Sequence, residues 1–366
     1  QPDLYGTRVT RAGAVLDADG IAISTTQYVR SDRHVASNGS DYFVAWADSR
    51  YSSKIGIVGM GSRITSAGTV VDGDGIPINL RKNWQLSPAV AFNGSHYLAV
   101  WEDDRNLLLG SNTIGMYDIY GARIARNGIV LDPNGIAIST APGIEESSPV
   151  VAANGSDYLV VWRDHRNDST TGSDIYGARV TGAGVVVDAG GLAISTAANL
   201  QSSPAVASNG SDYLVVWGDH RNGVNSDIYG TRISGAGVIT HPGGLAISTA
   251  ANRQSSPAMA SNGNDYLVVW EDERNVSTTG SDIYGARVSG IGVISDPMGL
   301  AVSSTEPWQR FPAVSSDGSG YLVVWVETTY GDLYGAHIGS DGTVLDRSAL
   351  AMNTDQVSPS LVYGGF

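Results

Sequence analysis

Residues 203–222 read SPAVASNGSDYLVVWGDHRN, and this stretch decides the fold. SPAVA and YLVVW are short apolar runs of strand type. Asn-Gly stands in the turn between them, where glycine takes a positive φ at little cost. Two such runs joined by Asn-Gly predict a β-hairpin with a type I′ turn. The apolar residues show no sustained 3.6-residue period, so we expect almost no helix.

The hairpin is one part of an internal repeat. The YLVVW block recurs with small changes, and its tyrosines are 55, 61, 55, 53 and 55 residues apart. A DIYGAR block and a LAIST-like run follow it, with a degenerate DIYGAR copy at residues 55–63. Four strand-like runs in a period of this length are typical of a β-propeller blade. The copies of the first block are YFVAW (42–46), YLAVW (97–101) and YLVVW (158–162, 213–217, 266–270, 321–325).

The repeat predicts an all-β chain, in which residues 1–366 form one seven-bladed β-propeller of four-stranded antiparallel blades. We expect the seventh blade to combine N-terminal strands (1–30) with a C-terminal strand (356–366), because pairing the chain ends removes open sheet edges. A six-bladed propeller is the alternative. Complete units begin near residues 31, 87, 148, 203, 256 and 311.

The W-x-D-x-R-N…D-I-Y pattern of these units resembles repeats in β-propellers of secreted and cell-surface proteins from bacteria and archaea. The resemblance covers essentially the whole chain and implies the propeller fold and a secreted or cell-surface location. It implies little about activity, because such propellers mostly lack an assigned one. Two units depart from the pattern: residues 55–63 lack DIYG, and VETTYGDLYGAH (326–337) follows a tryptophan without the D-x-R residues.

Composition limits the class of protein. The chain has 22 Lys and Arg against 36 Asp and Glu, a formal net charge of −14, which repels nucleic acid and anionic membranes. It has no cysteine, which excludes disulfides and thiolate chemistry. No run approaches the roughly 20 apolar residues of a membrane span. We expect a monomer whose partner is a polysaccharide or a cell-surface protein.

Charged residues recur at fixed positions after the YLVVW tryptophans. In five units an Asp stands two residues after the tryptophan and an Arg four residues after it. A catalytic site is normally single, so this repetition favours scaffold ion pairs. The alternative is calcium, because loops such as NDSTTGSD (167–174) and NVSTTGSD (275–282) offer carboxylate, hydroxyl and carbonyl oxygens. Ca²⁺ is the one cofactor that the sequence raises, and its candidate ligands are Asp164, Asp168, Asp174, Asp272 and Asp282.

Ligand-binding residues are expected in the loops that connect blades, because function in a propeller usually lies on one face at the channel mouth. Aromatic rings beside Arg are typical of a sugar-binding surface. The alternative is that the loop tryptophans only cap the inner strands. One of these loops carries an acidic pair, Glu145 and Glu146. The candidates for ligand binding are Tyr28, Arg30, Arg81, Trp84, Trp308 and Arg310.

No catalytic residue is assigned from the sequence. The histidines show no HxxxH or HxH spacing, and no GxSxG, Walker A or Rossmann fingerprint occurs. The main hypothesis is therefore an extracellular, non-catalytic binding propeller for a carbohydrate or cell-surface partner. The alternatives are a polysaccharide-active enzyme, either a lyase or a glycosidase, and a structural or interaction module of a larger surface protein.

Overall fold

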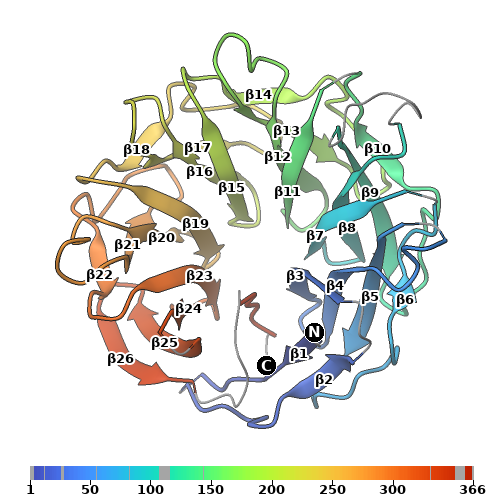
Figure 1. Ribbon diagram of the computed structural model, residues 1–366, viewed down its shortest axis with the longest axis horizontal. Helices are drawn as coiled ribbons and strands as arrows, with labels where there is room; N and C mark the ends of the chain where they lie inside the picture. Colours follow the sequence, from blue (N-terminus) through green and yellow to red (C-terminus); the bar gives the residue numbers. More distant parts are fainter. Residues whose placement is uncertain are drawn as a thin grey trace. The chain divides into compact units, whose positions relative to one another are not determined.

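The computed structural model describes residues 4–11, 13–25, 29–54, 56–81, 83–106, 116–142, 144–329, 331–350 and 359–364, with backbone alone at 29–32 and 346–348. Within these ranges every helix or strand assigned is a β-strand (Figure 1). The strands form six four-stranded antiparallel sheets and one two-stranded sheet, each in chain order. The same ranges contain no helical segment with the length and apolar character that a bilayer crossing requires.

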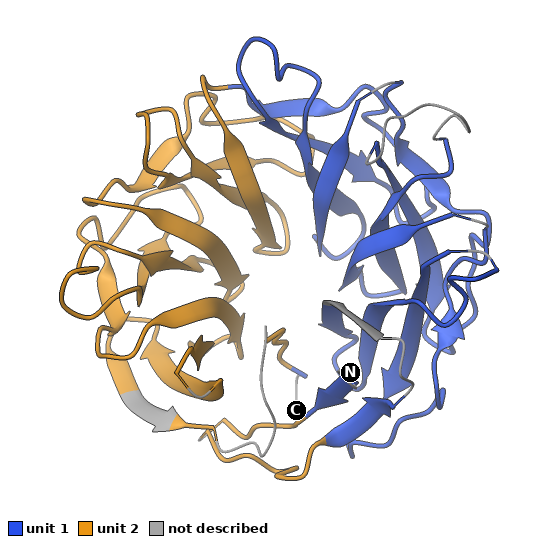
Figure 2. Ribbon diagram, in the orientation of Figure 1, with its two compact units in different colours: residues 1–6, 21–196, 364–366 blue, residues 7–20, 197–363 orange. Residues whose placement is uncertain are grey.

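A four-stranded meander that recurs along the chain is the blade of a β-propeller. The predicted fold class, an all-β propeller of seven blades, is therefore confirmed, with the two-stranded sheet as the seventh blade sheet among the described residues. The chain divides into two compact units, coloured separately in Figure 2. Unit 1 comprises residues 1–6, 21–196 and 364–366, and unit 2 comprises residues 7–20 and 197–363.

Unit 1 contains the two-stranded sheet and three of the four-stranded sheets. Their strands are β1 (Leu4–Gly6) and β2 (Ile21–Ser24); β3 (Val29–Ser37), β4 (Tyr42–Asp48), β5 (Val58–Ile64) and β6 (Ile76–Pro77); β7 (Gln85–Phe92), β8 (His96–Asp103), β9 (Asp118–Ala125) and β10 (Ile136–Ser139); and β11 (Glu146–Ala153), β12 (Tyr158–Asp164), β13 (Asp174–Val180) and β14 (Leu192–Ser195).

Unit 2 contains the other three four-stranded sheets. Their strands are β15 (Gln201–Ser208), β16 (Tyr213–Asp219), β17 (Asp227–Ile233) and β18 (Leu245–Ser248); β19 (Gln254–Ser261), β20 (Tyr266–Asp272), β21 (Asp282–Val288) and β22 (Leu300–Ser303); and β23 (Gln309–Ser316), β24 (Gly320–Glu327), β25 (Asp332–Gly339) and β26 (Val344–Ala349).

The first strand of each complete blade begins two residues before its predicted start. In the five blades from β7 onward the cause is a β-bulge at the serine or phenylalanine before the proline, as at Ser256 (φ 52°) and Phe311 (φ 55°). Proline cannot donate to a sheet ladder, and a bulge accommodates it inside the strand. The strand therefore continues beyond the bulge to a buried Gln or Glu.

The YLVVW strands supply the core, as expected for strands that are apolar on both faces. Trp162 and Trp270 are fully buried. Within unit 1, Leu98 of β8 packs in one cluster with Tyr158 and Trp162 of β12, so side chains of neighbouring blades share one apolar layer. The corresponding cluster in unit 2 joins β16 to β20.

The hairpin turns differ in type from the prediction. In the turn 38–41, Gly39 alone has a positive φ (+87°), and the Asn38 N–H donates to the Asp41 carbonyl at 3.0 Å. A positive φ at the first central position only is the mark of type II′, whereas type I′ needs it at both. The Asn38 side chain explains the choice, because its Oδ1 accepts the Ser40 and Asp41 N–H groups.

The repeated Asp and Arg residues pair within the scaffold. Asp272 accepts Arg274 Nε at 2.9 Å and Nη2 at 2.7 Å, and it also accepts the Trp270 indole N–H at 2.8 Å. The Arg274 guanidinium lies 3.9 Å above the ring of Tyr284 from the DIYG block. The expectation of scaffold ion pairs is therefore confirmed. The equivalent pairs are Asp48–Arg50, Asp103–Arg105, Asp164–Arg166 and Asp219–Arg221.

The N-terminal strands behave as the third and fourth strands of a blade. Leu4 of β1 pairs with Ser24 of β2, in the register that joins Ile119 to Ser139 in another blade. Leu4 packs in one cluster with Trp46 within unit 1. Residues 359–364 carry no strand, and residues 356–358 and 365–366 lie outside the described ranges. Closure by a C-terminal strand, and a single domain over 1–366, stay predictions.

Candidate functional site

The five aspartates considered as calcium ligands have donors from the protein itself. Asp164, like Asp272, is fully buried and accepts hydrogen bonds from an Arg and a Trp. Asp174 accepts Asn167 Nδ2 at 2.6 Å, and Asp282 accepts Asn275 Nδ2 at 3.0 Å. Asp168 lies 2.8 Å from His165 Nδ1. No group of three or more His, Cys, Asp or Glu that could hold a metal ion occurs in the described part of the chain, so calcium stays a prediction without geometric support.

Five of the blades present two variable side chains next to each other at one end of their first two strands. One belongs to the residue just before the first strand, and the other to the third residue after the YLVVW tryptophan. A backbone hydrogen bond joins the two residues: the Glu273 N–H donates to the Arg253 carbonyl at 2.8 Å. The equivalent pairs are Asp104 with Trp84, His165 with Glu145, His220 with Leu200, and Thr328 with Trp308.

Glu271 and Glu273 form an acid pair on one face of β20 and its continuation. Side chains alternate along a strand. Trp270 and Asp272 are hydrogen-bonded to each other on one side at 2.8 Å, which leaves Glu271 and Glu273 on the other. Same-face neighbours in a strand are about 7 Å apart. Acids at both positions occur in only one other blade, at Glu102 and Asp104.

Glu271 belongs to one blade of unit 2 and contacts the next blade of the same unit. Its Oε1 accepts the N–H of Phe311 at 2.8 Å. Burial raises the pKa of Glu271, against the opposing effects of the Phe311 N–H, Arg310, Ser256 and Arg253. Glu273 differs, because its carboxylate accepts no hydrogen bond and forms no ion pair with any residue that the structure describes. The two acids therefore have unlike environments.

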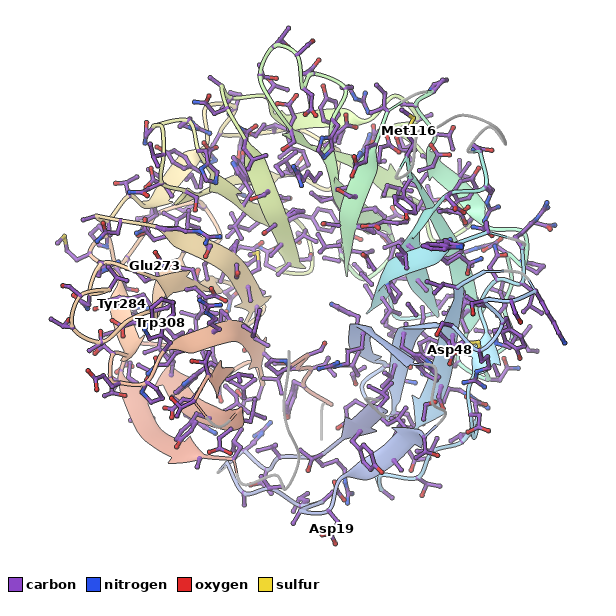
Figure 3. All side chains as sticks on the ribbon, viewed as in Figure 1. Asp19, Asp48, Met116, Glu273, Tyr284 and Trp308 are labelled. Carbon is purple, nitrogen blue, oxygen red and sulfur yellow. The ribbon has the colours of Figure 1, made fainter. Side chains whose placement is uncertain are left out.

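Trp308 and Arg310 belong to the segment that also supplies Phe311, and Arg310 is close enough to Glu271 to affect its pKa. Trp308 is 41 % exposed, and its indole ring packs against Gly280, where no Cβ intervenes. The Arg310 guanidinium is 5.1 Å from the centre of the Trp308 ring. Figure 3 labels Glu273, Tyr284 and Trp308, which come from the end of β20, from β21 and from the segment before β23.

A pocket of about 220 Å³ adjoins the cluster within unit 2. It is built from the bulge residues of three successive first strands, because a bulge redirects the side chain that it carries. Two of these residues, Ser256 and Phe311, also contact Glu271. Its walls are Ser203, Ser256, Pro257, Phe311, Pro312 and Pro359.

The acid pair of unit 1 is used by the protein itself. Asp104 Oδ1 accepts the Trp84 N–H at 2.6 Å, and Glu102 Oε1 accepts the Ser148 N–H at 2.7 Å. Glu102 is only 7 % exposed. Trp84 is 50 % exposed and lies against Gly56, as Trp308 lies against Gly280. The Glu102 and Asp104 carboxyl groups therefore each accept a backbone hydrogen bond, whereas the Glu273 carboxylate accepts none from the residues that the structure describes.

Glu145 and Glu146 do not form a working acid pair. Glu145 is exposed, whereas Glu146 is fully buried at the first position of β11. Burial raises the pKa of Glu146 to about 8, helped by the charges of Asp164 and Asp118 and opposed by the hydrogen bond from Ser139. The two side chains point to opposite faces because they are consecutive in an extended chain.

The structure brings together only some of the predicted ligand-binding residues. Trp308 and Arg310 share one surface in unit 2. Trp84 and Arg81 belong to unit 1, where Arg81 Nη2 donates to Asn134 Oδ1 at 2.8 Å. Tyr28, and the side chain of Arg30, lie outside the described residues.

Sequence reasoning missed Glu271 and Glu273. Both flank a repeated aspartate, and that repetition drew the interpretation to the scaffold. The signal that could have found them is their departure from the repeat, because the same two positions hold Gly218 and His220 in the preceding blade.

Comparisons with known proteins show the fold. No family model and no curated protein sequence matches the chain. A puromycin-hydrolyzing peptidase from Mycobacterium tuberculosis is similar over 100 % of this chain and 52 % of its own, with 12 % identity and a TM-score of 0.54, so this chain spans about half its length. An α-L-arabinofuranosidase from Lactobacillus brevis is similar over 70 % of this chain and 92 % of its own, with 11 % identity and a TM-score of 0.41. A GH43 endo-arabinanase from Bacillus licheniformis is similar over 71 % and 96 %, with 14 % identity and a TM-score of 0.40.

These comparisons also correct the main functional hypothesis. The structures named are hydrolases, two of them glycosidases, whereas the sequence led us to expect a non-catalytic binding propeller. That expectation was wrong because it treated repetition of Asp and Arg as the absence of a single site. The acids that break the repeat were overlooked, and the alternative of a polysaccharide-active enzyme is taken up as a proposal below.

Proposed function

We propose that the chain is a polysaccharide-active enzyme, a glycoside hydrolase that uses Glu271 and Glu273. The observation that carries the proposal is the acid pair itself: two carboxyl groups on one face of a strand, in unlike environments, beside an exposed tryptophan and a pocket. Glycoside hydrolysis needs such a pair, with one acid protonated and the other ionised.

The separation of the two acids favours the inverting reaction. Same-face strand neighbours are about 7 Å apart, and inverting enzymes hold their carboxyl groups about 6.5–9.5 Å apart so that a water fits between acid and sugar. Retaining enzymes hold them closer together. The backbone spacing of the pair therefore fits direct attack by water, and the stereochemistry of the product tests it.

Each acid has a distinct role. Glu271, whose pKa is raised by burial, donates its proton to the leaving glycosidic oxygen. Glu273, which has no other partner among the residues described, accepts a proton from the attacking water. The water oxygen bonds to the anomeric carbon as the carbon–oxygen bond of the glycoside breaks. Trp308 and Phe311, 41 % and 42 % exposed, offer flat apolar faces for sugar rings.

The test is cleavage of defined polysaccharides by the purified chain. Arabinan, xylan, polygalacturonate and alginate are incubated with the protein, and reducing ends and polymer length are followed. We expect at least one polymer to shorten and Glu271→Gln and Glu273→Gln to lower the rate about 10²-fold or more. Nuclear magnetic resonance of the first product should show inversion at the anomeric carbon.

The matched control is Glu102→Gln. Glu102 accepts a bulge N–H from the next blade just as Glu271 does, so it reports the structural cost of removing that carboxylate. We expect Glu102→Gln to keep nearly full activity. The proposal would be overturned if every polymer stayed intact, or if Glu102→Gln and Glu271→Gln lowered the cleavage rate equally. Products with the ultraviolet absorbance of an unsaturated uronate would identify a lyase instead.

A further inference from the structure

Two arginines of unit 2 differ from most arginines in the chain. Arginines that follow the repeat pair with an aspartate, as Arg274 does with Asp272 and Arg287 with Asp296. Arg253 and Arg310 stand at variable positions and form no ion pair with any residue in the described ranges. In a chain with a net charge of −14, two unpaired guanidinium groups on one surface need a reason.

Both guanidinium groups flank Glu271. Each lies close enough to favour the ionised form of that carboxyl group, but neither is within ion-pair distance of it. Arg253 is exposed and belongs to the same blade as Glu271, whereas Arg310 is half-buried and belongs to the next. Glu271 therefore lies near two positive charges, one from its own blade and one from the next.

Arg310 is held in place but not satisfied. Its guanidinium lies over the Trp308 ring, and its Nε is buried without a hydrogen-bond partner among the residues described. An unsatisfied buried donor costs stability. A planar guanidinium is suited to a carboxylate or an oxyanion, which it binds through two parallel hydrogen bonds.

We propose that this surface binds an anionic sugar residue, with its carboxylate or sulfate group on Arg310 and Arg253 and its ring against Trp308. The proposal deepens the proposed function, because it names the substrate class of the Glu271–Glu273 site. Uronates carry a carboxylate and sulfated sugars carry a sulfate ester. Both groups offer the negatively charged oxygens that a guanidinium group binds. A neutral sugar would leave both charges unpaired.

Direct binding separates this inference from catalysis. The Glu273→Gln chain, which keeps both arginines, is titrated with oligosaccharides of polygalacturonate and with the same oligosaccharides after carboxyl reduction. Carrageenan oligosaccharides and their desulfated form make the second arm. We expect the anionic form of one arm to bind about tenfold tighter or more than its neutral form, with the preference weakened by salt.

Variants assign the preference to the arginines. Arg310→Gln is expected to remove it, and Arg310→Lys to restore part of it because the charge returns without the fork. The control is Arg126→Gln, since Arg126 belongs to unit 1, where it donates to the Gly94 carbonyl and lies over Phe92. Circular dichroism confirms that each variant is folded. An unchanged preference in Arg310→Gln, equal binding of charged and neutral forms, or no binding in either arm overturns the inference.

Cleavage of the same polymers by the unmutated chain distinguishes the two proposals. If the anionic oligosaccharide binds through Arg310 but is never cut, the proposed function fails and the binding inference stands. If charged and reduced polymers are cut equally fast, the inference fails and the hydrolase stands.

Discussion

The indole ring of Trp308 lies directly against Gly280, so that a Cβ atom at position 280 would overlap its Cδ1. Gly280 belongs to the loop before β21, and Trp308 precedes the first strand of the next blade. One blade therefore supplies the aromatic surface, and the blade before it supplies the flat support. The same relationship recurs in unit 1 between Trp84 and Gly56.

Gly280→Ala should displace the Trp308 ring and weaken substrate binding. We expect KM to rise severalfold with a smaller change in kcat, and the tryptophan fluorescence spectrum to shift. The control is Gly263→Ala, because Gly263 also has a positive φ (+94° against +86°) but open space around it. Both variants carry backbone strain of about 1 kcal/mol. Equal effects on KM would show that the Trp308 contact does not matter.

The pH dependence of cleavage should show the environment of Glu271. Because burial raises the pKa of Glu271, the acid stays protonated above the ordinary glutamate range, and kcat/KM should fall on the alkaline side as it ionises. Arg310 lowers this pKa, so Arg310→Gln should move the alkaline limb to higher pH. A limb that stays in place, or moves to lower pH, contradicts the assignment of Glu271 as the acid.

Glu146 should make stability depend on pH. Its pKa in the folded protein is about 8, well above the value of an unfolded glutamate. A group with a raised pKa contributes its full stabilisation at low pH, where it is protonated in both the folded and the unfolded chain. This contribution is lost as the pH rises through the pKa of the group in the folded protein. Asp118 and Asp164 face Glu146 with like charge, and Arg166 opposes them 3.7 Å away.

The unmutated protein should therefore lose stability as the pH rises from about 5 to about 9, and the Glu146→Gln variant should not. Thermal unfolding of both proteins across this range should give melting temperatures that diverge by several degrees at the alkaline end. Gln254→Glu is the reciprocal variant, because Gln254 occupies the same buried first-strand position and donates to the Ala251 and Asn252 carbonyls. It should introduce the same dependence, and parallel melting curves in all three proteins would refute the idea.

Asp272 should be among the most important residues for stability. Asp272→Ala leaves the Arg274 guanidinium and the Trp270 N–H without their acceptor, a change that typically costs about 3–5 kcal/mol for a buried pair. Asp168→Ala removes a carboxylate that is 54 % exposed and should cost less than about 0.5 kcal/mol. Denaturant unfolding measures both, and similar costs would show that the buried pair is dispensable.

Calcium should have little effect on stability. The candidate carboxylates already accept hydrogen bonds from Arg, Trp, Asn and Thr side chains, so an ion would have to displace these donors. Melting temperatures with EDTA and with excess Ca²⁺ should agree within about 1 °C. A clear rise with Ca²⁺ would mean that the loops rearrange to bind it.

Much of the architecture was readable from the repeat. The spacing of YLVVW and the Asn-Gly turns predicted the blades, and the repeated Asp and Arg predicted the scaffold pairs. Local rules suffice for these features, because strand period, turn chemistry and a pair two residues apart are all local. The predicted type I′ turn was wrong because the Asn38 side chain binds the backbone N–H groups of Ser40 and Asp41. Residue composition does not reveal these hydrogen bonds.

The candidate site was only partly readable. Trp308 and Arg310 stood out as residues that break the repeat, and the structure places them together. Glu271 was missed because its importance comes from Phe311, 40 residues away in the next blade, whose N–H it accepts. A contact at that separation has no local signature.

The sequence by itself determined the all-β blade repeat, because apolar periodicity and turn residues act over a few neighbours. Only the tertiary structure decided which acids are chemically distinct. Glu271 and Glu102 both bind a bulge N–H of the next blade, but Glu273 is left without a partner among the described residues, while Asp104 is held by Trp84. Burial and proximity of residues distant in the chain set that difference, and neither is encoded in local sequence.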